Sequence, residues 1–373
     1  MRQIETDIAV VGAGSAGLCA AIQASKAGAK VMVFDENAAP GGQLFKQIHK
    51  FFGSSAHRAG IRGYVIGQQL LDEVKASGAE VRLNSVVYGI FDGDTLGIIE
   101  NEKEHYAVKA KKIILAGGAK ENYMGFPGST LPGVMGAGAA QTMINVNRVL
   151  PGRKILMIGS GNVGLIVSYQ LMQAGADVLA LVEAAPKIGG YGVHAGKIRR
   201  AGVPIMLGHT VLEAYGEKEV EGAIVAEVDN KFEPIPGTEK DIKCDTICLA
   251  VGLNPMTELA YMAGCEMAFV RAFGGHVPMH DEYQKTTVDT VYVAGDITSP
   301  EEASTAMEEG NIAGLAAAME LGTIDKAEAQ KKLTEFVDRI NSLRSGEFGE
   351  GRRLAKLEQI EAFHKFMDSQ EAE

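Results

Sequence analysis

Residues 8–36, IAVVGAGSAGLCAAIQASKAGAKVMVFDE, decide the fold. An apolar run is followed by three closely spaced glycines, a helix-forming stretch that ends at Gly28, and a second apolar run, so the order predicts strand, helix and strand. The glycines have the spacing that a dinucleotide-binding turn requires. Gly12 permits the tight turn, Gly14 lets a pyrophosphate approach the backbone, and Gly17 lets the helix pack closely on the strand.

Two acidic residues, Asp35 and Glu36, close the second apolar run. Asp35 lies 18 residues after Gly17, where a carboxylate can accept hydrogen bonds from a ribose. At the other end of the motif, the helix that begins with Ser15 and Ala16 offers unpaired N–H groups and a positive dipole end to phosphates. The strand, helix and acid together predict a nucleotide-binding βαβ unit.

The same unit occurs a second time in the chain. GSGNVGLIVSYQLMQAGADVLALVEAAPKIGG, from Gly159, matches the stretch from Gly12 over about 30 residues. Its glycine fingerprint and the start of its expected helix are formed by Gly159, Gly161, Asn162, Val163 and Gly164.

The acid of the second copy is displaced by one residue. Asp35 comes seven residues after Gly28, but the residue seven after Gly175 is Val182, and the carboxylate is Glu183. A strand one residue longer would still place Glu183 at the ribose; otherwise the site is degenerate or holds a different nucleotide. If the site takes a nicotinamide dinucleotide, Glu183 would repel a 2′-phosphate, which favours NAD over NADP.

Length and composition narrow the functional classes. The chain has 373 residues, well beyond the roughly 150 of one domain, so two domains are expected. A net charge of -11 without a concentrated basic stretch argues against nucleic-acid binding. No apolar run reaches the roughly 18 residues of a membrane span. With four cysteines, no C-x-x-C pair and no metal-ligand spacing, we expect a cytoplasmic protein without a metal site.

Further motifs make the chain resemble the pyridine nucleotide-disulfide oxidoreductase superfamily of flavoproteins. GGQL at 41–44 resembles the glycine pair and glutamine that run beside the flavin in the thioredoxin-reductase-like branch. IILAGGAKE at 113–121 and CLAVGLNP at 248–255 resemble the segments where such chains leave and re-enter the FAD domain. VYVAGDIT at 291–298 resembles the second FAD motif, whose aspartate, here Asp296, binds the ribityl chain.

This resemblance covers roughly residues 1–322 and implies an α/β protein of two Rossmann-like domains, each with a three-layer ββα architecture, the second inserted in the first. An FAD-binding domain would comprise residues 1–120 and 250–325, and an NAD-binding-like domain residues 121–249. A helical C-terminal tail would follow at 326–373.

The resemblance also implies which residues hold the cofactors. FAD would be bound by Gly12, Gly14, Ser15, Ala16, Gly17, Asp35, Glu36, Gly42, Gln43, Val87, Gly118, Gly295, Asp296, Ser304 and Thr305. NAD(H) would be bound by Gly159, Gly161, Asn162, Val163, Gly164 and Glu183. No catalytic residue is identified, and Gln43 and Lys46 are the candidates for side chains near the flavin ring. Ser304 and Thr305 lie at the start of an expected helix that would face the flavin pyrimidine.

The second half of the chain narrows the resemblance. GSGNVGLIVSYQL, EAAPKIGGYGVHAGKIRRAGVP and AVGLNPMTELAYMAGCE resemble nucleotide-binding subunits of multi-subunit amine and amino-acid dehydrogenases. The group includes the alpha subunits of heterotetrameric sarcosine oxidase and dye-linked proline dehydrogenase, with opine oxidase and hydrogen cyanide synthase. It implies a partner flavoprotein subunit of D-amino-acid-oxidase-like fold and leaves room for a small iron-sulfur subunit. FMN or an iron-sulfur cluster would be held only with such partners.

Thiol chemistry is not expected. The redox-active cysteine pair of the disulfide reductases has no counterpart in the matching segments, nor has the single flavin-side cysteine of the oxidase branch. Cys244 and Cys248 are expected on one face of a strand, four residues apart, which is too far for a disulfide.

Three functional hypotheses stay open. The first is an FAD-dependent subunit of an amine or amino-acid dehydrogenase or oxidase, which moves electrons between NAD(H), FAD and a partner subunit. The second is a stand-alone NADH:acceptor reductase that passes electrons to ferredoxin, a quinone or a dye. The third is a scaffold subunit whose second site holds a structural nucleotide such as ATP.

The C-terminal tail is expected to form two amphipathic helices. DKAEAQKKLTEFVDRINSLRSG places its apolar side chains at helical spacing, GEGRR interrupts, and LAKLEQIEAFHKFM supplies the second helix. The pair either packs on the FAD domain or forms a docking arm for another subunit.

Overall fold

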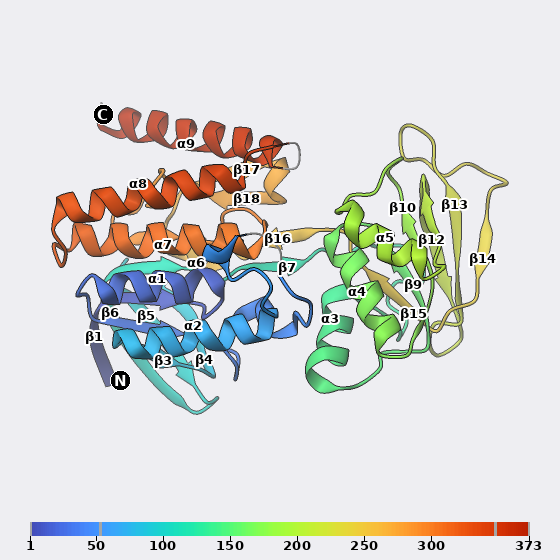
Figure 1. Ribbon diagram of the computed structural model, residues 1–373, viewed down its shortest axis with the longest axis horizontal. Helices are drawn as coiled ribbons and strands as arrows, with labels where there is room; N and C mark the ends of the chain where they lie inside the picture. Colours follow the sequence, from blue (N-terminus) through green and yellow to red (C-terminus); the bar gives the residue numbers. More distant parts are fainter. Residues whose placement is uncertain (1, 52–53, 347–348, 372–373) are drawn as a thin grey trace. The chain divides into compact units, whose positions relative to one another are not determined.

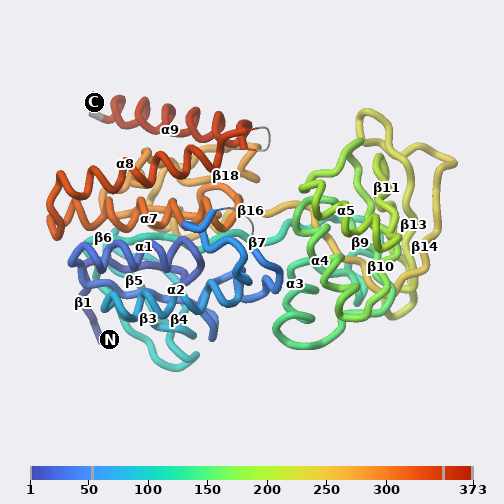
Figure 2. Tube along the Cα trace, viewed as in Figure 1, coloured from blue at the N-terminus to red at the C-terminus, as the bar shows by residue number. Residues whose placement is uncertain are grey.

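The computed structural model describes residues 2–51, 54–346 and 349–371. The chain folds into two compact units (Figure 1, Figure 2): unit 1 is formed by Met1–Lys120 with Asn254–Glu373, and unit 2 by Glu121–Leu253. The chain passes from one unit to the other in two short strands, β7 (Ala119–Glu121) and β16 (Leu253–Pro255). Unit 2 is therefore an insertion in unit 1, and the predicted α/β fold class is confirmed.

The main sheet of unit 1 has the strand order β3-β2-β1-β6-β5-β4, and β19 also pairs with β6. Its strands are β1 (Arg2–Val11), β2 (Val31–Phe34), β3 (Glu80–Arg82), β4 (Ser85–Phe91), β5 (Thr95–Glu100), β6 (Glu104–Leu115) and β19 (Val291–Val293). The pairs β1–β2, β1–β6, β2–β3 and β6–β19 are parallel, whereas β4–β5 and β5–β6 are antiparallel. The carboxyl ends of the parallel strands consequently meet at one edge.

Helices cover one face of this sheet. They are α1 (Ser15–Lys26), α2 (Gly63–Ser77), α7 (Ala303–Glu320) and α8 (Lys326–Leu343). Side chains alternate along β1: Ile8 and Val10 join the core under the helices, while Ala9 and Val11 join a second core on the opposite face. That second core lies between the parallel strands and the antiparallel β4–β5 hairpin, which gives three layers.

Unit 2 repeats this arrangement. Its parallel sheet has the order β11-β10-β9-β15-β8, with β8 (Val134–Gly136), β9 (Lys154–Ile158), β10 (Asp177–Glu183), β11 (Ile205–Leu207) and β15 (Thr246–Leu249). The helical side carries α3 (Ala137–Thr142), the π-helix η3 (Met143–Asn147), α4 (Asn162–Gln173) and α5 (Gly192–Arg200). The antiparallel β12 (His209–Tyr215), β13 (Gly222–Glu227) and β14 (Lys240–Ile242) cover the other face.

Smaller elements complete unit 1. They are η1 (Gly42–Lys46), η2 (Ser55–His57), α6 (Glu258–Met262), β17 (Met267–Val270), η4 (Arg271–Phe273) and β18 (Gly275–Pro278). Among the described residues, no helix has both the length and the apolar character that a membrane crossing requires.

The tail packs on unit 1. Helix α8 lies along α7 (Figure 1), and its buried side chains include Leu333, Phe336 and Ile340. The last helix, α9 (Glu350–Glu371), begins inside the GEGRR segment that the sequence predicts as an interruption, so that prediction is wrong. Only Gly349 of the segment lies before the helix, and its N–H donates to the carbonyl of Gly346 at 3.1 Å.

The prediction for Cys244 and Cys248 is also wrong. Cys248 lies in the core under the helices of unit 2, whereas Cys244 lies in the core on the opposite face. Strand β15 begins only at Thr246, so the alternation that places residues four apart on one face does not extend back to Cys244.

Candidate dinucleotide sites

The three glycines of the first fingerprint have distinct surroundings. A Cβ atom at Gly12 would collide with the carbonyl oxygen of Ala116, and one at Gly17 would collide with that of Gly12. Gly12 also has φ +104°, a left-handed conformation that favours glycine. At Gly14 the nearest atom, Cα of Gly42, is 4.0 Å away. Two glycines therefore serve the fold, and Gly14 leaves open space beside the start of α1.

The acid that follows β2 accepts a hydrogen bond from this turn. Asp35 Oδ2 accepts the backbone N–H of Ala13 at 2.6 Å, and Oδ1 accepts N–H groups from Asn37 at 2.8 and 2.9 Å. The carbonyl of Asp35 accepts the N–H of Ser85 at 2.8 Å, which places the start of β4, two residues before Val87, next to the acid. Glu36 follows Asp35 and is exposed.

Segments distant in sequence meet at the same edge of unit 1. Gly41 forms a parallel bridge with Gly14, and a Cβ at Gly42 would lie 3.0 Å from Cα of Gly14. A Cβ at Gly295 would lie 2.8 Å from Cβ of Ala16, beside the first turn of α1. Gly118, three residues after β6 ends, has φ +78°, and beyond its own chain neighbours no atom of the described part of the chain lies within 4 Å of its Cβ position. The predicted FAD residues thus come from four strand ends that adjoin one another.

The loop after β19 carries a half-buried acid. Asp296 accepts the N–H of Glu301 at 3.3 Å through Oδ1. Burial raises the pKa of Asp296 to about 7, and the neighbouring carboxylates of Glu309 and Glu301 add to this rise. Ser299, which is 2% exposed, has a hydroxyl oxygen with no hydrogen-bond partner among the described residues. Such an orphaned buried group indicates a missing partner at this position.

The remaining predicted residues lie around the same edge. Helix α7 begins at Ala303, as expected after Asp296, so Ser304 and Thr305 are in its first turn. The hydroxyl of Thr305 donates its hydrogen bond to the carbonyl of Glu302 at 2.6 Å, within the same helix start. Gln43 is exposed in η1, and Lys46 lies 6.0 Å from the ring centroid of Phe45.

Unit 2 reproduces the glycine geometry. A Cβ at Gly159 would collide with the carbonyl oxygen of Ala250, and one at Gly164 would collide with that of Gly159. Apart from its chain neighbours, no residue that the structure describes has an atom within 4 Å of the Cβ position of Gly161. The turn leads into α4, whose first residues are Asn162 and Val163. Each unit therefore has open space at the second glycine of the fingerprint.

A β-bulge explains how the acid of the second copy, displaced by one residue in the sequence, still reaches the end of its strand in register with the turn. The register of β10 against β9 shifts between Val178 and Ala180, so Leu179 is an extra residue. Gly159 then donates to the carbonyl of Val182 at 2.7 Å, as Gly12 donates to that of Phe34 at 2.7 Å. The residue after each carbonyl is the acid, Glu183 or Asp35. The longer strand, one of the two alternatives left open by the sequence, is the one observed.

Some site residues were missed by the sequence analysis. Gly189 and Gly190 lie over the second fingerprint: Gly190 donates to the carbonyl of Ser160 at 2.9 Å, and Tyr191 donates to Oδ1 of Asn162 at 2.9 Å. The repeated sequence contains this glycine pair in both copies, a signal that could have located it. Ser299 had no such signal because its burial depends on packing between distant elements.

Residues 6–310 match the pyridine nucleotide-disulphide oxidoreductase family. The chain belongs to this family. Membership of the pyridine nucleotide-disulphide oxidoreductases implies binding of FAD and NAD(P), and together with the oxidase relatives it supports an FAD-dependent oxidoreductase.

Three curated relatives are components of larger enzymes. The HcnB subunit of hydrogen cyanide synthase from Pseudomonas aeruginosa is 28% identical, and the match covers 90% of this chain and 75% of the relative. An opine oxidase subunit from Agrobacterium tumefaciens is 30% identical, over 84% and 66%. The alpha subunit of sarcosine oxidase from Rhizobium meliloti is 29% identical, over 69% of this chain but only 25% of the relative. The predicted resemblance is confirmed, although the chain spans just a part of each relative.

Solved structures share the fold. Thioredoxin reductase of T. acidophilum has a TM-score of 0.70 at 23% identity and covers 85% of this chain and 99% of its own. L-Proline dehydrogenase of P. horikoshii has a TM-score of 0.67 at 22% identity, over 90% of this chain and 59% of its own. Both likenesses agree with two Rossmann-like units, one inserted in the other.

Proposed function

We propose that this chain is the FAD- and NAD-binding subunit of a multi-subunit amine or amino-acid dehydrogenase or oxidase. The observation that carries the proposal is that three relatives matched across most of this chain are named as subunits of hydrogen cyanide synthase, opine oxidase and sarcosine oxidase. In this proposal unit 1 holds FAD, unit 2 holds NAD(H), and a partner flavoprotein subunit of D-amino-acid-oxidase-like fold oxidises the amine.

The residues of unit 1 fit FAD. Open space at Gly14 beside the N-terminus of α1 suits a pyrophosphate, because unpaired N–H groups and the helix dipole favour an anion there. The second oxygen of Asp296 and the orphaned hydroxyl of Ser299 suit the hydroxyl-rich ribityl chain. FAD, when bound, supplies the two-electron chemistry that links a nicotinamide to another acceptor or donor. The chain itself binds and orients it.

The first turn of α7 supports the same assignment. Ser304 and Thr305 lie where backbone N–H groups at a helix start have no partner within the helix, shortly after Asp296 in the chain. Such N–H groups stabilise negative charge without a change of conformation. Gln43 and Lys46 in η1 remain the candidates for contacts with the flavin ring.

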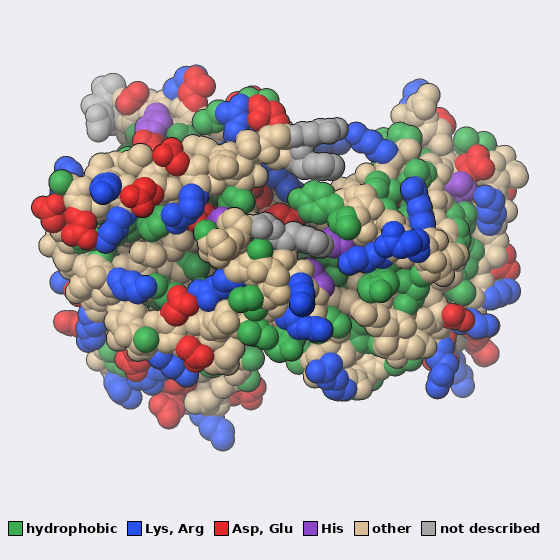
Figure 3. Space-filling view, viewed as in Figure 1, with side chains coloured by type: hydrophobic (Ala, Val, Ile, Leu, Met, Phe, Trp, Pro, Cys, Tyr) green, Lys and Arg blue, Asp and Glu red, His purple; other side chains and the backbone are tan. Residues whose placement is uncertain are grey.

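Unit 2 supports NAD(H) as the second nucleotide. The bulge at Leu179 places Glu183 where Asp35 lies in unit 1, and a carboxylate there favours a ribose diol over a 2′-phosphate. Lys and Arg side chains gather over α5 on the visible face (Figure 3), and its last turn contains Lys197, Arg199 and Arg200. This positive charge attracts an anionic dinucleotide to unit 2.

The described cysteines support a mechanism without a thiol centre. Burial raises the pKa of Cys19, Cys244 and Cys248 to about 12, so these groups are protonated at neutral pH. Since the thiolate is the reactive form, they are poor nucleophiles. Burial also raises the pKa of Cys265.

An anaerobic titration tests the NAD(H) assignment. The purified FAD-loaded chain is titrated with NADH while the visible absorbance of the flavin is followed. We expect bleaching at about one equivalent, and a slower, weaker response in Glu183→Ala. Flavin colour that persists at excess NADH would mean that unit 2 holds another nucleotide.

Isolation of the tagged chain from its native host tests whether it works within a complex. We expect a second flavoprotein to co-purify and the complex to reduce a dye when supplied with a secondary amine or amino acid. A lone chain that passes electrons from NADH to ferredoxin, a quinone or a dye at full turnover would establish the stand-alone reductase instead.

A further inference from the structure

The loop at 295–299 is held by a buried carboxylate. Glu309, in the second turn of α7, accepts the backbone N–H of Gly295 at 2.8 Å and the hydroxyl of Thr298 at 2.9 Å. Both bonds go to Oε2, and the side chain is 2% exposed. Glu309 therefore clamps the residues on either side of Asp296.

Two cations from the tail hold the other oxygen of Glu309. Nη2 of Arg344 lies 2.6 Å from Oε1, and Nζ of Lys356 lies 3.2 Å from it. Although burial opposes ionisation, the positive charges of Lys356 and Arg344 hold the pKa of Glu309 below its ordinary value. The carboxylate that clamps the loop is thus kept charged by the tail.

Lys356 also contacts the loop directly. Its Nζ donates to the hydroxyl oxygen of Thr298 at 2.6 Å and lies 3.4 Å from Nε2 of His280. Nδ1 of His280 donates to the carbonyl of Asp281 at 2.8 Å, so Nε2 is left to accept from the ammonium. Nζ further lies 5.3 Å from the ring centroid of Phe273, within cation–π range.

The inward face of α9 carries both polar and apolar side chains. Lys356, Gln359 and Phe363 are buried, whereas Leu354 and Leu357 are 48% and 50% exposed. The face of α9 that packs on unit 1 therefore combines the polar contacts of Lys356 with apolar burial.

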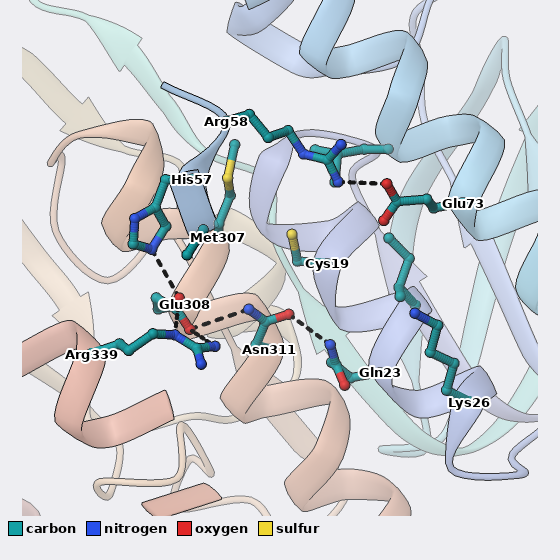
Figure 4. A pocket seen from close by; sticks show the side chains of 13 residues that line it. Cys19, Gln23, Lys26, His57, Arg58, Glu73, Met307, Glu308, Asn311 and Arg339 are labelled. Carbon is teal, nitrogen blue, oxygen red and sulfur yellow. Dashed lines mark hydrogen bonds and ion pairs between the residues drawn. The ribbon is translucent and has the colours of Figure 1, made fainter. Parts of the chain in front are cut away.

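The neighbouring glutamate is paired separately. Glu308 accepts bonds from Arg339 of α8 at 2.7 and 3.0 Å and lies 2.9 Å from Nε2 of His57, beside a cavity of about 150 Å³ (Figure 4). No bond from Glu308 to the 295–299 loop is found among the described residues. The contacts to the loop run through Glu309 and Lys356.

We propose that Lys356 is a positioning residue of the FAD site. Through Thr298 and Glu309 it fixes the 295–299 loop in the conformation that presents Asp296 to the cofactor. Helix α9, which lies beyond the family match at 6–310, thereby sets the FAD affinity of unit 1. The inference rests on the proposed FAD site.

Lys356→Met tests the role, since it removes the ammonium while keeping an unbranched side chain. Apoprotein is titrated with FAD, and the quenching of flavin fluorescence gives Kd. We expect Kd to rise at least tenfold and the visible band of bound FAD to change shape. Lys365→Met, on the exposed face of the same helix, should leave Kd within about threefold.

Thr298→Val tests whether Lys356 acts on the loop through the hydroxyl of Thr298. It should weaken FAD binding to a similar extent, and in the double variant with Lys356→Met the two losses should not multiply, because both act on one contact. Multiplicative losses, or a folded Lys356→Met protein with wild-type Kd and spectrum, would overturn the proposal. If Lys356→Met does not fold, Thr298→Val with unchanged Kd would do the same. Wild-type protein that fails to bind FAD would overturn the FAD site itself, which is a different result.

Discussion

The carboxylate of Glu183 accepts the backbone N–H of Ser160 at 2.9 Å and its hydroxyl at 2.8 Å. Asp35 makes the corresponding bond to Ala13 in unit 1 at 2.6 Å. In both units the acid at the end of the second strand thus hydrogen-bonds to the residue that follows the first glycine of the fingerprint. The two sites share this local geometry although their sequences differ in length between glycine and acid.

Replacing Glu183 should affect the second site alone. We expect Glu183→Ala to weaken NADH binding by about tenfold, because the ribose loses its acceptor and the Ser160 turn loses its tie. Isothermal titration with NADH measures this, and Asp35→Ala serves as the control, with weakened FAD binding and unchanged NADH binding in the apoprotein. Equal NADH affinity in wild type and Glu183→Ala would refute the assignment.

The fingerprint glycines should separate folding from binding. Gly12→Ala meets Ala116 and requires a left-handed φ, so it should lower the free energy of unfolding by about 2–4 kcal/mol. Gly14→Ala meets open space and should leave stability within about 1 kcal/mol while weakening FAD binding. Urea denaturation and FAD titration of both variants check this. A strongly destabilised Gly14→Ala protein would contradict the assignment of that space.

Asp296 should give the apoprotein a pH-dependent stability. Its pKa is raised from 3.8 to about 7 by burial, so the folded state opposes ionisation. The resulting loss of stability is absent below about pH 4, grows as the pH rises to 7, and is complete above pH 7. We therefore expect Asp296→Asn to stabilise the FAD-free protein by about 1–3 kcal/mol at pH 8 and little at pH 4.5. Denaturation curves at the two pH values measure the difference, which a pH-independent effect would not reproduce.

The ion pair of Glu308 and Arg339 should contribute more to stability than the partial exposure of Arg339 suggests. Arg339 is 38% exposed, but Glu308 is 2% exposed and would lose its bidentate partner in Arg339→Met. We expect the free energy of unfolding to fall by about 2 kcal/mol, because a buried carboxylate would be left with weaker partners. Lys332→Met removes an exposed pair with Glu328 on the same helix and should cost less than about 0.5 kcal/mol. Thermal melting distinguishes the two variants.

The fold could be predicted because the glycine spacing acts locally. Gly12, Gly17, Gly159 and Gly164 meet backbone atoms within their own units, as the motif requires. The bulge at Leu179 could not be predicted, since it depends on how β10 pairs with β9 rather than on residue type. The sequence shows an acid displaced by one residue but does not show whether the strand before it absorbs the extra residue.

The buried charges were also beyond prediction from the sequence. Glu309 and Lys356 are 47 residues apart, and each looks like an ordinary charge on a helix surface. The leucines of the last helix indicate an amphipathic helix, yet Leu354 and Leu357 are half exposed, whereas Lys356 faces inward and meets the loop. Such pairings arise only when distant helices pack together.

The tail has a practical consequence for mapping contacts with a partner. A fragment cut at the end of the family match would keep Glu308 and Glu309 in α7 but lose Arg339, Arg344 and Lys356. The apolar core that α8 covers would then be open to water, and the truncated chain should aggregate. Deletion experiments that lose a binding partner along with the tail would report a collapsed core rather than a missing docking arm, so point variants on the exposed side of α9 are the better tool.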